Sequence, residues 1–254
     1  MTSNNFIPLN HCENPKMIVF YFPYGGGSES SFIPIVSLLP DWCRCYSFQP
    51  PGRGKYLLSE PIDEMGKLVD ITSVQVRELL AEGIPFVFFG HSLGAWVAYE
   101  TAYRLWTDLR ITPNHLFISA AKAPSRIQST NRIRGMETQG LLDYFSNVEE
   151  IPIKIRRNHM MLRIYVPMLR ADYILAEEYS RNSFSKFPIS LSVLLGTNDS
   201  TITDEEGTEW YAISSKRPKK QLLFFEGDHL FINTSQASIS KHLVREISDI
   251  VNKM

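Results

Sequence analysis

Short hydrophobic runs recur along the chain, and stretches with helical spacing separate most of them. The runs cover residues 17–22, 43–48, 85–89, 115–119, 189–195 and 221–225. Several of them are almost continuous in valine, isoleucine, leucine and phenylalanine. Strands that are buried on both faces of a parallel sheet have this character, whereas a strand with one solvated face alternates. The runs therefore predict the strands of a mostly parallel sheet.

The stretches between these runs predict helices at residues 31–39, 63–80, 92–106 and 235–251. In the second stretch, Leu68, Ile71 and Val74 follow the spacing of one helix face. Asp63 suits the start of this helix and Gly83 its end. Strands that alternate with helices indicate an α/β sheet that is flanked by helices.

The alternation stops between about residues 123 and 187. No strand-like run occurs there, and the segment is instead helical in pattern and rich in large apolar residues. Pro167 lies inside it and is expected to kink or end a helix. We predict a helical insertion over one end of the sheet, within a single domain that spans residues 1–254.

Composition narrows the class of protein. The 254 residues are 44% hydrophobic and 21% charged, with a formal net charge of −1, which is typical of a globular protein with a full core. Nucleic-acid binding would need a strongly basic surface, so this balance argues against it. The three cysteines, Cys12, Cys43 and Cys45, are too few and too close for a disulfide framework. They are expected to be buried thiols in a reducing compartment.

The N-terminal stretch lacks the basic start and apolar run of a signal peptide. No hydrophobic run approaches the length of a membrane-spanning helix. We therefore expect a cytoplasmic protein without a membrane segment.

The strongest chemical signal is the sequence Gly90-His91-Ser92-Leu93-Gly94, which fits the pattern G-x-S-x-G. A hydrophobic run enters it and a predicted helix leaves it. This is the strand–turn–helix context in which the α/β-hydrolase fold presents a nucleophilic serine, and the two glycines leave space for the sharp turn. We predict that Ser92 is a nucleophile.

A serine hydroxyl needs a neighbouring base, and six histidines compete for this role. His229 follows the run at residues 221–225, at the carboxyl end of a strand, where ligand chemistry gathers in open α/β sheets. It also comes last in the chain order serine, acid, histidine. His91 adjoins the serine, but its side chain is expected to point away. The remaining histidines, which fit the role less well, are His11, His115, His159 and His242.

The acid that orients the histidine should lie between Ser92 and His229 in the sequence. Asp199 fits because it comes just after the run at residues 189–195, again at a strand end. Three other aspartates compete with it, one in the insertion, one at the start of a predicted helix and one beside the histidine: Asp172, Asp204 and Asp228.

Acyl transfer also needs backbone amides that stabilise the developing oxyanion. The amide of Leu93, just after the serine, is one candidate. The other should come from the glycine-rich loop at residues 22–28, where three glycines permit close approach to a substrate. This loop lacks the lysine and the spacing of a phosphate-binding P-loop. No group of Cys and His residues has the spacing of a metal site.

Taken together, the chain resembles the type II thioesterases that accompany nonribosomal peptide and polyketide synthases, with the medium-chain thioesterase of fatty acid synthesis as a relative. The resemblance covers nearly the whole chain. It rests on the order and spacing of six segments, at residues 22–28, 51–54, 90–95, 169–173, 196–199 and 227–231. The chain departs from the family pattern at Gly25, where alanine is usual, and at Lys55 and Tyr56, where a second arginine often stands.

The resemblance implies an α/β-hydrolase fold in which Ser92, Asp199 and His229 form the catalytic triad. It places the second oxyanion amide at Tyr24 or Gly25. The substrate it implies is an acyl group on the phosphopantetheine arm of an acyl or peptidyl carrier protein, which a housekeeping enzyme removes without a cofactor. The insertion at residues 123–187 would be the lid over the acyl pocket, and the lid residues expected to bind substrate are Met160, Met161, Tyr165 and Met168.

A monomer is expected, and a basic face on the lid and its flank would attract the acidic carrier. The basic residues in question are Lys122, Arg126, Arg132, Arg134, Lys154, Arg156, Arg157 and Arg163. Three other functions stay open: an esterase or lipase for small molecules, a medium-chain fatty acyl thioesterase, and a non-catalytic binding protein.

Overall fold

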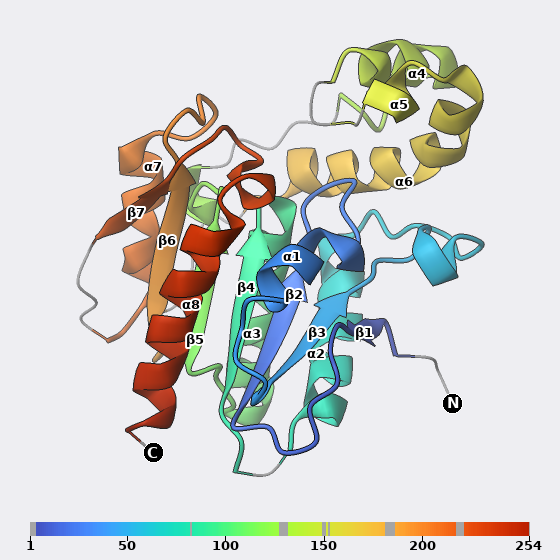
Figure 1. The fold of residues 1–254 in the computed structure, drawn as a ribbon. Helices are drawn as coiled ribbons and strands as arrows, with labels where there is room; N and C mark the ends of the chain where they lie inside the picture. Colours follow the sequence, from blue (N-terminus) through green and yellow to red (C-terminus); the bar gives the residue numbers. More distant parts are fainter. Residues whose placement is uncertain are drawn as a thin grey trace.

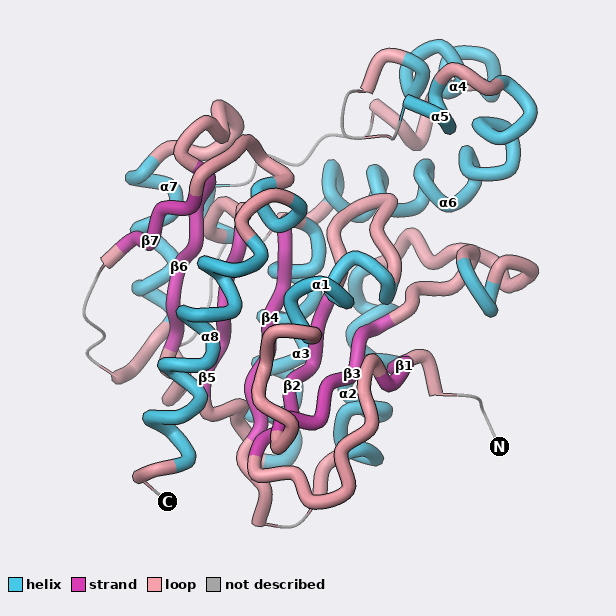
Figure 2. The backbone as a smooth tube through the Cα atoms, viewed as in Figure 1, coloured by secondary structure: helices cyan, strands magenta, loops and turns pink. Residues whose placement is uncertain are grey.

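The computed structural model describes residues 4–81, 83–126, 132–148, 151, 153–180, 186–216 and 221–253. Its centre is a seven-stranded sheet in the order β1-β3-β2-β4-β5-β6-β7 (Figures 1 and 2). All neighbouring strands are parallel except β1, which pairs with β3 antiparallel. The predicted mostly parallel sheet is confirmed. The strands are β1 (Phe6–Pro8), β2 (Met17–Phe22), β3 (Cys43–Phe48), β4 (Phe86–His91), β5 (His115–Ser119), β6 (Leu191–Gly196) and β7 (Leu222–Phe225).

Helices cover both faces of the sheet, which is why its central strands are apolar throughout. Every residue of β2, β4 and β6 is buried. In Figure 1, α1 (Ile33–Val36) and α8 (Gln236–Val251) lie on the near face, and α2 (Met65–Leu79) and α3 (Leu93–Leu109) lie behind the sheet. The helix pattern of the sequence located all four.

The edge strand β1 was not predicted from the sequence. It is only three residues long, and Pro8 removes one hydrogen-bond donor, which an edge strand tolerates. Its place is fixed by side-chain packing: Phe6 makes edge-to-face contacts with Phe20 and Phe22, with ring centroids 5.3 and 5.6 Å apart. Neither contact leaves a periodic signal in so short a segment.

The chain between β5 and β6 rises above the sheet as three helices (Figure 1). These are α4 (Thr138–Ser146), α5 (Ile153–Arg156) and α6 (His159–Glu178). They enclose a buried hydrophobic cluster that is separate from the core around the sheet and includes Phe145 and Leu162. This segment, called the lid below, lies within the helical insertion predicted at residues 123–187; residues 127–131, 149–150, 152 and 181–185 are outside the described part.

Pro167 does not end the lid helix, which was one of the two outcomes expected from the sequence. It lies inside α6, which continues for more than two turns beyond it. The neighbouring side chains of Val166 and Met168 are buried in the lid cluster. This packing offsets the backbone hydrogen bond that proline cannot donate. Of the helices described here, none is both long and apolar enough to cross a membrane.

Candidate functional site

Ser92 lies at a sharp turn between β4 and α3. Its backbone has φ 53° and ψ −122°, and residues other than glycine rarely adopt a positive φ of this kind. A Cβ atom at Gly90 would collide with the backbone at Gly94 and Ala95, and one at Gly94 would collide with the carbonyl group of Phe22. The two glycines are therefore required for the close packing that holds Ser92 in this strained position.

Three side chains from three strand ends meet at this turn. His229 Nε2 lies 2.9 Å from Ser92 Oγ, and His229 Nδ1 lies 2.8 Å from Asp199 Oδ2. Asp199 follows β6 and His229 follows β7, as the sequence predicts from the strand-end rule. Because a carboxylate only accepts, Nδ1 carries the proton and Nε2 is left to accept the serine hydroxyl proton.

Asp199 is held in the ionised form. Burial raises the pKa of its carboxyl, but hydrogen bonds from His229 and Thr201 outweigh this effect and lower the pKa to about 2. Thr201 donates both its backbone amide, at 2.9 Å, and its hydroxyl, at 2.6 Å, to Asp199 Oδ1. The second carboxylate oxygen is thereby left for His229. Sequence reasoning missed Thr201, although its place two residues after the aspartate is typical of such a turn.

The three competing aspartates are engaged elsewhere. Asp172 pairs with Arg53 at 2.6 Å. Asp228 accepts a 2.8 Å hydrogen bond from the amide of Leu230. Asp204 is the first residue of α7 (Asp204–Thr208), as its helix-start interpretation predicts. This leaves Asp199 as the aspartate that contacts the His229 ring.

His91 has a structural part in the site that the sequence analysis did not foresee. Its ring Nε2 lies 2.9 Å from the backbone carbonyl of His229, and its Nδ1 lies 2.8 Å from Ser119 Oγ. Burial, with the nearby His229, lowers the pKa of His91 to about 3, so the ring is neutral. Nε2 therefore donates to the carbonyl and Nδ1 accepts from Ser119. His91, next to Ser92 in the sequence, thus anchors the loop that carries His229.

The amides of the glycine-rich loop are divided between two uses. Gly26 donates to Asp172 Oδ2 at 2.7 Å, and Gly27 donates to the carbonyl of Tyr24 at 2.8 Å. Within the described residues, the amides of Tyr24 and Gly25 have no hydrogen-bond acceptor. Leu93 is the first residue of α3, where backbone amides lack acceptors in their own helix. These three amides, which the sequence also singled out, are available to a ligand.

A cavity of about 640 Å³ lies between the glycine-rich loop and the lid. Its wall includes Tyr24, Gly25 and Leu230, the residue after His229. From α6 it includes two of the four lid residues expected to bind substrate, Tyr165 and Met168.

The other two lid residues do not line this cavity, which corrects the expectation for them. Met160 is 75% exposed and Met161 is 38% exposed. Both lie in the first turn of α6. The side chain of Asn158 accepts hydrogen bonds from their backbone amides and so determines where the helix begins. This start turns their side chains towards solvent instead of towards the cavity.

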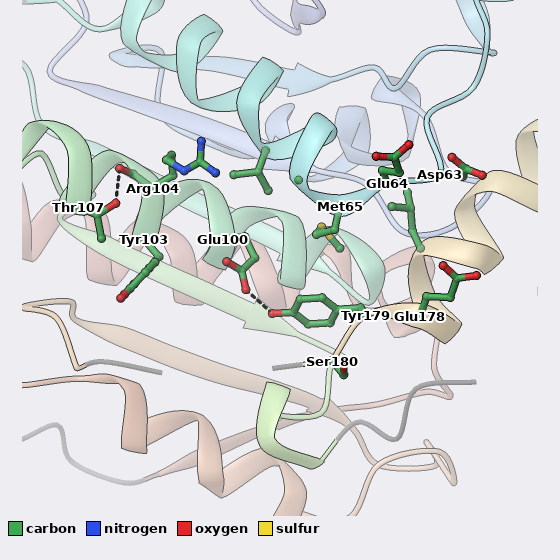
Figure 3. Close-up of a pocket in the computed structure, with 13 residues that line it drawn as sticks. Asp63, Glu64, Met65, Glu100, Tyr103, Arg104, Thr107, Glu178, Tyr179 and Ser180 are labelled. Carbon is green, nitrogen blue, oxygen red and sulfur yellow. Dashed lines mark hydrogen bonds between the residues drawn. The ribbon is translucent and has the colours of Figure 1, made fainter. Parts of the chain in front are cut away.

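A second cavity, of about 490 Å³, is formed by α2, α3 and the end of α6 (Figure 3). Its wall mixes polar and apolar side chains and includes Asp63, Glu64 and Glu100, which is hydrogen bonded to Tyr179 at 2.8 Å. The wall contains neither Ser92 nor its partners. Among the described residues, no group of three or more His, Cys, Asp or Glu side chains is placed to hold a metal ion.

Known proteins similar to this chain include biosynthetic thioesterases. The gramicidin S biosynthesis protein GrsT of Aneurinibacillus migulanus is 25% identical over 242 residues, which cover 95% of this chain and 93% of GrsT. The type II thioesterase BorB from the borrelidin biosynthetic cluster superposes with a TM-score of 0.84 at 22% identity, over 97% of this chain and 99% of BorB. The type II thioesterase YbtT of the yersiniabactin pathway gives 0.82 at 24% identity, over 96% and 98%.

The two structural matches show the fold, and the predicted α/β-hydrolase fold is confirmed. The family model for the thioesterase domain matches residues 17–251, which is nearly the whole chain. The resemblance stated from the sequence motifs is thereby confirmed as well. The chain belongs to the thioesterase family, the serine hydrolases of acyl thioesters.

Proposed function

We propose that this enzyme hydrolyses acyl groups held as thioesters on the phosphopantetheine arm of carrier proteins, and that it clears stalled or wrongly primed groups from a peptide or polyketide synthase. The observation that carries the proposal is the hydrogen-bonded series Ser92–His229–Asp199, beside a cavity that the glycine-rich loop, Leu230 and the lid line together. GrsT is named for gramicidin S biosynthesis, which supports the same setting for this chain.

In this proposal the three residues act as a catalytic triad. Ser92 Oγ attacks the thioester carbonyl while His229 Nε2 takes its proton. The amide of Leu93 and that of Tyr24 or Gly25 stabilise the resulting oxyanion. The carbon–sulfur bond then breaks, and His229 returns the proton to the departing thiolate. Water, deprotonated by His229, hydrolyses the acyl-enzyme and restores Ser92, so the cycle needs no cofactor.

The acyl chain is proposed to occupy the cavity under the lid. Its volume of about 640 Å³ lies within the range of small-molecule sites. Met168 is 3% exposed, and as an unbranched side chain it can adapt to acyl chains of different shape. Tyr165 lies one turn before it on the same side of α6. We retain these two as substrate-binding residues and no longer include Met160 and Met161.

The carrier is proposed to dock on the basic part of the lid. Several of the basic residues expected there already form ion pairs with acidic residues of the same chain. The pairs are Lys122 with Glu206, Arg132 with Glu177, and Arg134 with Asp63 and Glu178. The side chain of Arg126 lies outside the described part. Of the basic residues expected there, the ones without an ion pair in the described part lie on α5, between α5 and α6, and early in α6: Lys154, Arg156, Arg157 and Arg163. They form the proposed docking surface for an acidic carrier.

The decisive experiment compares one acyl chain on a holo carrier protein with the same chain on a pantetheine fragment. We expect a higher kcat/KM on the carrier and a decline of this advantage with salt, because screening weakens attraction between exposed charges. Arg157→Glu should lower the rate on the carrier and leave the rate on pantetheine unchanged. Lys241→Glu on α8 is the matched control and should change neither rate. Equal rates on both substrates at every salt concentration would contradict the carrier proposal.

Adding a simple ester and a series of acyl lengths to this experiment separates the other candidate functions. A small-molecule esterase or lipase would prefer simple esters to both thioesters. A medium-chain fatty acyl thioesterase would hydrolyse the carrier substrate but favour one range of fatty acyl lengths. A binding protein without catalysis would bind the acyl-carrier and release no thiol.

The pH dependence of hydrolysis gives an independent prediction. Because the pKa of Asp199 is about 2, this carboxylate stays charged throughout the working range. His91 is neutral there as well, since its pKa is about 3. We therefore expect neither group to add a step to the pH profile, so kcat/KM should show only the single rise between about pH 5 and 8 that a histidine base gives in general. Steady-state rates across this range provide the test, and a flat profile would contradict a histidine base.

A cytoplasmic location and a monomeric state belong to the same proposal. Cys12, Cys43 and Cys45 are free and buried, which suits a reducing compartment. Burial raises the pKa of Cys43 to about 12, so this thiol is unreactive at neutral pH. Size-exclusion chromatography with light scattering measures the oligomeric state.

A further inference from the structure

A buried ion pair joins the lid to the glycine-rich loop. Arg53 Nη2 lies 2.6 Å from Asp172 Oδ1, and the two side chains are 6% and 4% exposed. Arg53 comes from the turn after β3, and Asp172 from the middle of α6. A buried pair of this kind is costly to desolvate and costlier to break, because removing one partner leaves an uncompensated charge. Packing alone would be satisfied more cheaply by apolar side chains at these positions.

Both partners also bind the backbone of the loop that carries Tyr24 and Gly25. Asp172 Oδ2 accepts from the amide of Gly26 at 2.7 Å, and Arg53 Nη1 donates to the carbonyl of Gly27 at 2.8 Å. Three hydrogen bonds join the Gly26 amide, Asp172, Arg53 and the Gly27 carbonyl, and the backbone from Gly26 to Gly27 closes them into a ring. Gly27 in turn donates to the carbonyl of Tyr24, which closes the turn.

The lid helix also touches this turn directly. Gly26 has φ +81°, and a Cβ atom there would lie 3.2 Å from the side chain of Leu169 on α6. Tyr24, Arg53, Leu93 and Asp172 all line one small cavity, so the ion pair lies beside both sources of oxyanion amides. Any displacement of Asp172 would therefore be transmitted to the backbone that precedes Gly26.

We propose that Arg53 and Asp172 are a positioning pair, which holds the amides of Tyr24 and Gly25 towards the reacting carbonyl and couples the placement of the lid helix to the oxyanion hole. This inference rests on the proposed function, since it assigns those amides to the oxyanion. Asp172 accepts the hydrogen bond of the Gly26 amide, so this amide is not free for the substrate and those of Tyr24 and Gly25 are. The Arg53–Asp172 pair thus contacts both α6, which lines the acyl cavity, and the loop that carries the oxyanion amides.

The test is Asp172→Asn, which preserves an oxygen for the Gly26 amide and removes the charge that faces Arg53. On an acyl-pantetheine thioester we expect kcat to fall by about 10- to 100-fold, because a shift of the order of 1 Å in a positioning group has effects of this size. KM should stay within about threefold, since the interaction is made in the transition state. The pH midpoint of kcat/KM should not move, because His229 and Asp199 are untouched.

A binding measurement separates positioning from a merely structural role. A trifluoromethyl ketone with the same acyl chain adds to Ser92 and forms a tetrahedral oxyanion, whereas the thioether analogue of the substrate forms none. In Asp172→Asn the affinity for the ketone should fall by the same factor as kcat/KM, and the affinity for the thioether should be unchanged. Arg53→Lys keeps the charge but loses the forked geometry, so it should show a smaller loss of the same kind.

The matched control is Asp63→Asn, which removes a 2.8 Å ion pair between Arg134 of the lid and the segment before α2. This ion pair also joins the lid to the rest of the fold, but it does not contact the glycine-rich loop. We therefore expect kcat to stay within about twofold of wild type. Unchanged ketone affinity and kcat in both Asp172→Asn and Arg53→Lys would overturn the inference. So would equal weakening of ketone and thioether binding. Lack of thioester hydrolysis by the wild-type enzyme would instead refute the proposed function.

Discussion

Replacement of Ser92 by alanine is expected to lower kcat for acyl-thioester hydrolysis by about 10³-fold or more. Ser92 Oγ lies 2.9 Å from His229 Nε2 and is the group at the turn that can form an acyl-enzyme. The substitution removes one oxygen atom and retains a Cβ, so the strained backbone at φ 53° is unchanged and the protein should stay folded. Thiol release from an acyl-pantetheine, together with the thermal unfolding midpoint, measures both effects.

Ser73→Ala on α2 serves as the control for this experiment, because its hydroxyl donates to the carbonyl of Asp70 and lies in another part of the fold. A fluorophosphonate should label the wild-type enzyme and Ser73→Ala but not Ser92→Ala. Hydrolysis near the wild-type rate in Ser92→Ala would mean that the nucleophile is a different residue.

Replacement of Asp199 by asparagine is expected to lower kcat by about 10³- to 10⁴-fold, because an amide can donate to the imidazole and so favours the wrong tautomer. In the native protein the ionised carboxylate accepts from His229 Nδ1 at 2.8 Å, which leaves Nε2 unprotonated and facing Ser92. Thr201 would still hold the carbonyl oxygen of the new amide. The NH₂ group would then face His229, so the loss should appear in kcat more than in KM.

Asp228→Asn is the comparison for this prediction. Asp228 stands next to the histidine in sequence, but its carboxylate accepts from the Leu230 amide and not from the ring. We expect a loss of less than about tenfold, from a small effect on the loop. A larger loss in Asp228→Asn than in Asp199→Asn would reverse the assignment of the acid.

The parts of the fold that follow from continuous or periodic burial were predictable from the sequence. The strands β2, β4 and β6 are buried along their whole length, and a short run of apolar residues between turns is typical of such strands. The positions of Asp199 and His229 followed from a topological rule, because carboxyl ends of parallel strands share one edge of the sheet. No knowledge of side-chain conformation was needed for either step.

Features that depend on contacts between distant segments were not predictable in the same way. Arg53 and Asp172 are separated by 119 positions in the sequence, and neither stands at a position that marks an ion pair. His91 was expected only to point away from the serine, and its hydrogen bond to the carbonyl of His229 depends on how the last loop folds back. The exposure of Met160 depends on where α6 begins, which Asn158 sets through one side-chain cap.

The separate hydrophobic cluster of the lid has a consequence for how such enzymes diversify. Its buried residues pack mainly on one another, while the neighbouring strands β5 and β6 keep their register through direct pairing. Phe145 packs against Tyr173, which lines the cavity under the lid, so a change in the size of Phe145 is expected to alter that cavity wall without disturbing the strand ends that carry Ser92, Asp199 and His229. Selection for a new acyl chain can therefore change residues of the lid while the residues at the strand ends stay the same. The hydrogen bonds of Arg53 and Asp172 limit this independence, because they tie α6 of the lid to the glycine-rich loop beside Ser92. A changed lid must still keep these contacts.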